Sequence, residues 1–222
     1  MLVKNWMTRD VVTVAEDLSM LEASQVMREK KVRLLPVLSK NGELVGIVSD
    51  RDIKAASPSK ATTLDMHELY YLLSKLKVKE VMTKKPYTIG PDDTVDKAAV
   101  YLLEKRISGL PVVDGGRLVG ILTKGDVFRV LTSITGVYRG GVLLAFELED
   151  RAGSIREVAD EIRSAGGRMV SILTSYGNAP EGRRHVFYRV VDLRDDEFEA
   201  LIETLKAKFK YLYHVKDELK GI

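Results

Sequence analysis

The sequence predicts an α+β chain in which one β-α-β-β-α unit occurs twice, related by pseudo-twofold symmetry, and a β-α-β-β-α-β unit follows. Three observations support this class. The stretch LVGIVSDRDI at 44–53 returns as LVGILTKGDV at 118–127. The stretch VKNWMT at 3–8 returns as VKEVMT at 78–83. From about residue 137 onward the spacing of apolar residues changes, and the pattern of the two copies does not recur.

Each copy opens with a short extended piece that leads into an amphipathic helix. In both helices apolar residues recur at three- and four-residue spacing, which predicts a buried stripe. Ser19 and Glu22 match the S-x-x-E capping box at the start of the first helix. Thr94 takes the same position in the second copy. The expected extended pieces are 11–14 and 87–89, and the expected helices are 20–29 and 95–104.

Two strands joined by a tight turn follow each helix. In the first copy RLLPVLS and ELVGIVS flank Asn41-Gly42, a dipeptide that strongly favours a hairpin. In the second copy GLPVVD and RLVGILT flank Gly115-Gly116. A further helix is expected after each second strand. Copies of about 55 residues are small for independent cores, so we expect them to pack on each other around a pseudo-twofold axis.

The segment between the copies, 57–77, predicts one packing helix. Pro58 ends the preceding helix, and Thr63 or Asp65 can cap a new one. The apolar stripe of this helix consists of Leu69, Leu72, Leu73 and Leu76.

The remaining third of the chain reads as a split, ferredoxin-like β-α-β-β-α-β arrangement. Strands are expected in GVLLAFELED, RMVSILTSY, RHVFYRVVD and YLYHVK, and helices in SIREVADEIRSAGG and DDEFEALIETLKAKF. Ser154 and Glu157 match a capping box. One sheet face lacks helices, so we expect this domain to pair with a second copy of itself. The expected domains are 1–135, divided into a first copy at 1–57, a linker helix at 58–77 and a second copy at 78–135, and then 136–222.

Composition excludes several function classes. The formal net charge is +3, from 35 basic and 32 acidic residues, which is too balanced to predict a nucleic-acid-binding surface. The chain has no cysteine, so disulfides and thiolate chemistry are excluded. No signal-peptide core and no apolar run of about 20 residues is present, which predicts a soluble, cytoplasmic protein without a membrane segment.

Nothing in the sequence predicts an enzyme. The three histidines, His67, His185 and His214, lack metal-ligand spacing, so no metal site is expected. No nucleophile-elbow, Walker or dinucleotide fingerprint is present, so no catalytic residue and no catalytic cofactor is expected.

The repeated [ST]-x-x-D motif has two interpretations. Ser49 with Asp52, and Thr123 with Asp126, match a capping box at a helix start, which by itself stabilises a helix by about 0.5–2 kcal/mol. A helix start is also a seat for anions, and a carboxylate there can accept both hydroxyl hydrogens of a ribose. Both interpretations remain open from the motif alone.

The residues around the motif favour a ligand. Gly46 and Gly120, on the strand just before it, leave space in which a ligand can approach the backbone. Basic residues flank both aspartates, namely Arg51, Lys124 and Arg129. A capping box alone requires neither the glycine nor the basic flank.

These features together resemble a known module. The leading Met-Thr, the hydrophobic-Pro-Val strand and the G-h-x-[ST]-x-x-D motif (h, hydrophobic), present twice in register, resemble two cystathionine-β-synthase-type (CBS) domains in tandem over about residues 1–132. The stretch ELEDRAGSIREVADEIRSAGGRMVSI resembles an ACT domain, a small-molecule-sensing ferredoxin-like fold, over about residues 137–217. This domain order is similar to that of acetoin-utilisation-type CBS–ACT proteins.

The resemblance implies that two clefts between the copies bind AMP, ADP, ATP or an S-adenosyl compound. Asp52 and Asp126 would bind ribose hydroxyls, and Ser49 and Thr123 would contact ribose or phosphate. The adenine of one cleft would lie against Val12, Thr13, Leu35 and Pro36, and that of the other against Tyr87, Thr88, Leu110 and Pro111. The candidate phosphate partners are Arg33, Arg51 and Lys124.

The two clefts are not expected to be equivalent. Arg33 aligns with Ser108, and Arg51 aligns with Gly125. We therefore expect the first cleft, with Arg33 and Arg51, to favour ligands that carry more phosphate charge.

The resemblance also points to a loop in the last domain, Asp150, Arg151, Ala152, Gly153 and Ser154, which in amino-acid-binding ACT domains meets the ligand at a dimer interface. Gly153 fits that role, whereas Ala152 stands where proline is more usual. The alternative is that the loop is only a capped helix start.

Two functions from different classes follow. The first is a regulatory sensor that binds an adenosine ligand and relays its state through an ACT dimer to an unidentified regulated protein, with homodimerisation through both domain types. The second is an assembly module with no physiological nucleotide. No nucleic-acid partner and no membrane partner is expected.

Overall fold

The computed structural model describes residues 1–56 and 66–216, without the side chains of 66–70 and 196. The chain forms two compact units, Met1–Phe128 and Arg129–Ile222. The expected caps at Pro58, Thr63 and Asp65 and the side chains of His67 and Leu69 lie outside the described residues.

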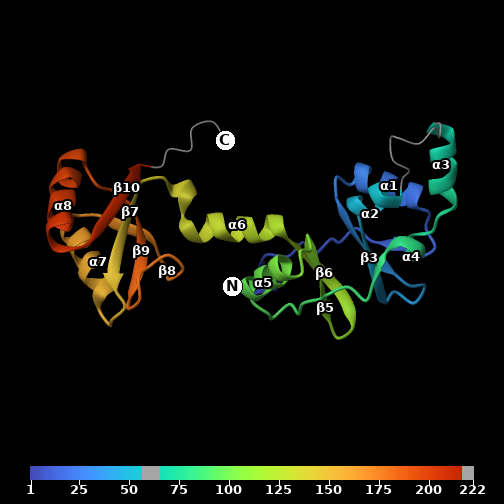
Figure 1. Ribbon diagram of the computed structural model, residues 1–222, viewed down its shortest axis with the longest axis horizontal. Helices are drawn as coiled ribbons and strands as arrows, with labels where there is room; N and C mark the ends of the chain where they lie inside the picture. The colour runs from blue at the N-terminus through green and yellow to red at the C-terminus, as the bar shows by residue number, and fades with distance from the viewer. Residues whose placement is uncertain (57–65, 217–222) are drawn as a thin grey trace. The chain divides into compact units, whose positions relative to one another are not determined.

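The first copy forms the elements that the sequence predicts, except that the extended piece expected at 11–14 forms a strand only at Val14–Ala15. Its helix α1 begins after Ser19, whose side chain and backbone complete the capping box with Glu22, which confirms that prediction. The hairpin turn at Gly42 has a φ of 79°, a conformation that glycine adopts without strain. The elements, labelled in Figure 1, are η1 (Val3–Asn5), β1 (Val14–Ala15), α1 (Met20–Glu29), β2 (Leu34–Leu38), β3 (Leu44–Ser49) and α2 (Asp50–Ala56).

The second copy repeats the same order. The helix that corresponds to α1 is α5; it has the predicted bounds, and Thr94 caps it by accepting the N–H of Lys97. The expected extended piece before α5 is reduced to a single bridge from Ile89 to Val112. The elements are α4 (Val78–Val81), β4 (Thr83–Lys84), α5 (Val95–Glu104), β5 (Gly109–Asp114), β6 (Arg117–Thr123) and α6 (Lys124–Thr135).

The leading segment of each copy packs on the other copy. Thr83 in β4 pairs with Ile47 in β3, so that one sheet has the order β1-β2-β3-β4 and contains strands of both copies. Thr8 pairs in the same way with Ile121 in β6. After this exchange the chain returns to its own copy, where Val14 pairs with Val37 in parallel. The sequence alone does not predict this exchange.

Gly46 and Gly120 serve the exchange rather than a ligand. A Cβ on Gly46 would lie 2.3 Å from Met82 Sδ, and a Cβ on Gly120 would lie 2.4 Å from Met7 Sδ. Each glycine therefore leaves room for a methionine that arrives from the other copy. The expectation that these glycines open the backbone to a ligand is wrong.

The exchanged residues also complete the core of the copy that receives them. The core of the first copy contains Val14, Met20, Leu35, Val37 and Val48 together with Val78 and Met82 of the second leading segment. In return, Val3 is fully buried, and its N–H donates to the carbonyl of Asp93. Neither copy therefore has a complete core of its own.

The linker helix α3 (Met66–Lys75) packs on the first copy. Leu73 belongs to that core and Leu76 packs against it, whereas Leu72 is exposed. Of the predicted apolar stripe, Leu73 and Leu76 therefore contact the core, and Leu72 does not.

The second unit has the predicted β-α-β-β-α-β order. Its four strands form an antiparallel sheet in the order β10-β7-β9-β8, and its core lies between this sheet and helices α7 and α8 (Figure 1). The elements are η2 (Val137–Arg139), β7 (Val142–Glu149), α7 (Ser154–Ser164), β8 (Arg168–Ser175), β9 (Arg183–Val191), α8 (Asp195–Lys208) and β10 (Tyr211–Lys216).

The sheet face away from α7 and α8 is partly covered within the chain. Arg189 alternates with the core residues Tyr188 and Val190, so it points to that face. It is buried, and its Nε donates to the carbonyl of Thr135 at 2.8 Å. Ser171 Oγ donates to the same carbonyl at 2.9 Å. The end of α6 therefore closes part of the face that was expected to need a second copy.

The predicted capping box of Ser154 and Glu157 is wrong. The residue before α7 is Gly153, with a φ of 88°, and Ser154 is already helical. Ser154 Oγ donates instead to the carbonyl of Arg151, and Glu157 accepts two hydrogen bonds from the Arg151 guanidinium.

Within the described ranges, no helix is long and apolar enough to cross a membrane.

Substitution of Gly46 and Gly120, which leave room for Met82 and Met7, tests the exchange of leading segments directly. We expect Gly46→Ala and Gly120→Ala each to destabilise the chain by about 1–3 kcal/mol, because the added Cβ overpacks a buried methionine. Gly125→Ala is the matched control, since a Cβ there meets only Thr123 Oγ1 at 3.5 Å. Urea unfolding measures all three variants. Equal stability of Gly46→Ala and the control would contradict the exchange.

Candidate functional site

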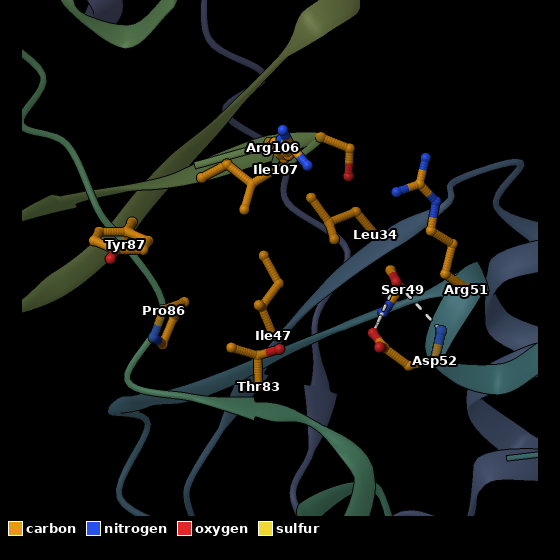
Figure 2. Close-up of a pocket in the computed structure, with 12 residues that line it drawn as sticks. Leu34, Ile47, Ser49, Arg51, Asp52, Thr83, Pro86, Tyr87, Arg106 and Ile107 are labelled. Atoms are coloured by element: carbon orange, nitrogen blue, oxygen red, sulfur yellow. Dashed lines mark hydrogen bonds between the residues drawn. The ribbon is translucent and has the colours of Figure 1, made fainter. Parts of the chain in front are cut away.

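The strongest candidate site is a pocket of about 280 Å³ between the two copies, here called the interrepeat pocket. Figure 2 shows Ser49 and Asp52 on one side of it, Pro86 and Tyr87 on the opposite side, and Leu34 and Ile47 between them. The first copy contributes Leu34, Ile47, Ser49, Arg51 and Asp52, and the second contributes Thr83, Pro86, Tyr87, Arg106, Ile107, Ser108 and Gly109.

The exchange of leading segments explains why both copies line the pocket. Thr83 pairs with Ile47, so the chain enters the second copy directly beside the end of β3. Pro86 and Tyr87 come next and form the wall opposite Asp52. The two copies also touch here directly, since a Cβ on Gly109 would lie 2.6 Å from Leu34 Cδ2.

The Asp52 carboxylate performs a capping role and still lines the pocket. Its Oδ2 accepts the N–H of Ser49 at 2.7 Å and the hydroxyl of Ser49 at 2.7 Å, drawn as dashed lines in Figure 2. Ser49 Oγ in turn lies 3.4 Å from Asp52 N. The capping interpretation of the motif is therefore confirmed for Asp52. Oδ1 of Asp52 has no hydrogen-bond partner among the described residues, which leaves it available to a ligand.

The same capping bonds use a backbone N–H group that was expected to bind an anion at the helix start. The N–H of Ser49 is already taken by Asp52, and α2 is described over only seven residues. Positive charge in the pocket therefore comes from arginine side chains rather than from the helix end.

Two arginines from different copies line the pocket. Arg51 lies in the first turn of α2, and Arg106 follows α5 with a φ of 53°. Both side chains are exposed, and neither guanidinium forms a hydrogen bond or ion pair with any described residue. Arg51 was expected in one cleft with Arg33, whereas it lines the pocket with Arg106 and Ser108.

The second motif is more enclosed than the first. Asp126 Oδ2 accepts the N–H of Thr123 at 2.8 Å and its hydroxyl at 2.7 Å, as in the first copy. Asp126 is only 3% exposed, however, whereas Asp52 is partly exposed. The two motifs share their capping geometry, but the aspartate of the first is more exposed to solvent than that of the second.

The pocket unites five of the predicted site residues, Ser49, Arg51, Asp52, Tyr87 and Ser108. Leu35 and Leu110 are 0% exposed, and Pro36 and Pro111 are also buried, so these four are core residues of β2 and β5 that support the walls. Thr13 lines a separate cleft of about 700 Å³ beside the hairpin turns at Gly42 and Gly116. The other predicted residues do not line the interrepeat pocket; they are Val12, Arg33, Thr88, Thr123, Lys124 and Asp126.

Seven lining residues were not predicted from the sequence, namely Leu34 and Ile47 on β2 and β3 of the first copy and five residues of the second copy. Thr83 and Pro86 lie just after the repeated Met-Thr, and Arg106, Ile107 and Gly109 lie just before the hydrophobic-Pro-Val strand. The repeated Met-Thr and the repeated hydrophobic-Pro-Val strand mark where these residues lie in the sequence. Their place in the pocket could not be predicted without knowing that the leading segment of each copy pairs with the other copy.

The predicted loop of the second unit, residues 150–154, is closed by its own ion pairs. Arg151 donates to Glu149 at 2.8 Å and to both carboxylate oxygens of Glu157 at 2.7 and 2.9 Å. The Arg151 hydrogen bonds hold the pKa of Glu157 below its usual value. Arg151 and Ser154 line a pocket of about 170 Å³, and Asp150, Ala152 and Gly153 do not. Among the residues that the structure describes, no group of three or more His, Cys, Asp or Glu side chains could hold a metal ion.

Comparison with protein families gives one match. The CBS domain model matches residues 3–59 and 78–133, together just over half of the chain. Among curated proteins, the homoserine O-acetyltransferase of Methanohalobium evestigatum is 35% identical over 130 residues, which are 58% of this chain and 24% of that enzyme. The chain therefore spans about a quarter of the length of this relative.

Solved structures of CBS pairs are also similar. The pair of protein MJ0100, in complex with 5′-methylthioadenosine and S-adenosyl-L-methionine, is 30% identical with a TM-score of 0.50, and the match covers 59% of this chain and 95% of that one. CBSX2 of Arabidopsis thaliana in complex with AMP is 36% identical with a TM-score of 0.50, over 60% and 98% of the chains. A protein assigned to acetoin utilization (AcuB) from Vibrio cholerae is 27% identical with a TM-score of 0.52, over 63% and 96%.

The closed loop of the second unit makes a pH-dependent prediction. Because Arg151 stabilises the charged form of Glu157, the pKa of Glu157 lies below its usual value, and this favourable interaction is lost as pH falls through it. We expect Arg151→Gln to return the pKa of Glu157 to the usual range, as followed by carboxyl NMR titration. An amino acid that binds the loop through its carboxylate must compete for Arg151, so it should raise the pKa of Glu157. An unchanged pKa in Arg151→Gln would contradict the ion-pair lock.

Proposed function

Because the chain belongs to the CBS domain family, we propose that it is a regulatory protein that binds an adenosine nucleotide or an S-adenosyl compound in its interrepeat pocket. One observation carries this proposal: a pocket that contains the Ser49–Asp52 motif of one copy is closed by Tyr87 and Ser108 of the other. The similar pairs that hold AMP, or 5′-methylthioadenosine with S-adenosyl-L-methionine, support the ligand class. The proposed role is regulatory rather than catalytic.

In the proposed complex each side of the pocket has its own task. The free Oδ1 of Asp52 accepts the ribose hydroxyls, and the Ser49 hydroxyl lies beside it. Tyr87, which is 53% exposed, offers an aromatic wall, and Lys105 Nζ lies 5.4 Å from its ring centroid. Leu34 and Ile47 give the adenosine an apolar floor. A second seat, at Thr123 and Asp126 with Val12, Thr13, Arg33 and Lys124, remains part of the proposal.

Binding at this pocket would report on the arrangement of the two copies. A ligand that touches Asp52 and Tyr87 touches both copies at once. It shifts their arrangement only to the extent that its affinity differs between arrangements. Because both copies line the interrepeat pocket, a change in their arrangement changes the pocket and with it the affinity for the ligand.

The second unit completes the proposed relay. We propose that residues 1–135 form the sensing pair and that 136–222 form an ACT-like domain that joins a second chain, so that a homodimer acts on a partner protein. Its β-α-β-β-α-β order and its sheet order support this domain type. The similarity to the acetoin-utilization protein supports a role in that process.

A thermal-shift panel tests the proposed function. At 100 times its Kd, a ligand that binds only the folded chain adds about 2.7 kcal/mol of stability, so the correct adenosine compound should raise Tm by several degrees. The panel contains AMP, ADP, ATP, S-adenosylmethionine, 5′-methylthioadenosine and inorganic phosphate. We expect Asp52→Asn to abolish the shift, because the ribose acceptor loses its charge.

Asp50→Asn is the matched control, because Asp50 is on the same helix, pairs with Lys54 and does not line the pocket. If no adenosine compound raises Tm, the sensor is excluded and the assembly-module alternative is favoured.

A further inference from the structure

We propose that the interrepeat pocket selects adenosine ligands with two or three linked phosphates over AMP and over S-adenosyl compounds, with Arg51 and Arg106 as the specificity-determining residues. This inference rests on the proposed function and names the ligand class of the same pocket. It differs from the sequence expectation, which paired Arg51 with Arg33.

The pocket carries more positive than negative charge. Among its lining side chains Arg51 and Arg106 are cationic at neutral pH, and Asp52 is the single carboxylate. The Oδ2 of that carboxylate is engaged with Ser49 rather than with an arginine. Neither guanidinium has a hydrogen-bond or ion-pair partner among the residues that the structure describes. Two unpaired cations on one small pocket favour an anion that can satisfy both.

The chemistry of the guanidinium group favours phosphate. Each arginine presents a planar fork of donors that fits two phosphate oxygens, and a hydrogen bond between charged groups is stronger than a neutral one. A single phosphate next to the ribose can occupy one fork fully. A second linked phosphate supplies the other guanidinium with oxygens of its own and adds negative charge against the two cations. A sulfonium cation, as in S-adenosylmethionine, adds positive charge to a pocket that already has an excess of it.

The repeated sequence shows that this pair of charges is particular to one pocket. The position that corresponds to Arg51 in the second copy is Gly125, and the position that corresponds to Arg106 in the first copy is Lys31. Lys31 and Arg106 share a positive φ, of 54° and 53°, because helices α1 and α5 end in the same way. The backbone is therefore common to both copies, whereas the two-arginine combination occurs once.

Selection by phosphate charge would let the pocket distinguish ATP and ADP from AMP. A polyphosphate that engages Arg51 of the first copy and Arg106 of the second links the two copies through more charge-assisted hydrogen bonds than the single phosphate of AMP does. ATP or ADP and AMP would then favour different arrangements of the same pair.

Calorimetry on the full chain in metal-free buffer tests the inference with ATP, ADP, AMP, adenosine and S-adenosylmethionine. We expect ATP and ADP to bind the native chain at least about 10-fold tighter than AMP, the factor that one charge-assisted bond supplies. Arg51→Gln and Arg106→Gln should each reduce this ratio, and the double variant should bring it close to one. Lys54→Gln, which removes an exposed cation from the same helix without touching the pocket, should leave the ratio unchanged.

The outcomes separate the two proposals. Binding of all adenosine compounds with equal affinity, or a preference for AMP or S-adenosylmethionine, overturns the charge selection while leaving an adenosine sensor. An unchanged ratio in the double variant also overturns it. Absence of binding by every compound, adenosine included, overturns both proposals.

Discussion

The structure of the first unit depends on one constraint, namely that the leading segment of each copy must pack on the other copy. Thr83 pairs with Ile47 and Thr8 pairs with Ile121. Behind each pairing, a methionine occupies the space that a glycine leaves open, as Met82 does at Gly46. Because these contacts complete both cores, neither copy has a complete hydrophobic core without the other. The duplicated sequence is therefore one structural unit rather than two linked ones.

This constraint also creates the candidate site. The chain leaves the Thr83–Ile47 pairing at the end of β3, where the Ser49–Asp52 motif begins, and so brings Tyr87 to the opposite wall. The Asp52 carboxylate caps the helix through Oδ2, and its Oδ1 has no hydrogen-bond partner among the described residues. At Asp126 the same two bonds occur at a side chain that is only 3% exposed.

Much of the fold could be predicted from the sequence because its signals are local. Caps such as Ser19 with Glu22, glycine-containing turns and apolar periodicity each lie within a few residues, and they give the helices and hairpins of both copies. The site could be predicted only in part, because its two halves come from different copies and a repeat does not reveal which copy a segment pairs with. For this reason Arg106 was missed and Arg51 was paired with Arg33. Leu35 and Leu110 were misplaced because a strand pattern does not show which buried face meets a cavity.

The most direct measurement is a set of intermolecular NOEs between bound ATP and the full chain. The account predicts contacts from one bound molecule to both copies: from ribose protons to Ser49 and Asp52, and from adenine protons to the ring of Tyr87. Both sets should disappear together when Asp52 is replaced by asparagine. Contacts confined to one copy, or adenine contacts to Tyr87 without ribose contacts to Asp52, would contradict a pocket built by the exchange of leading segments.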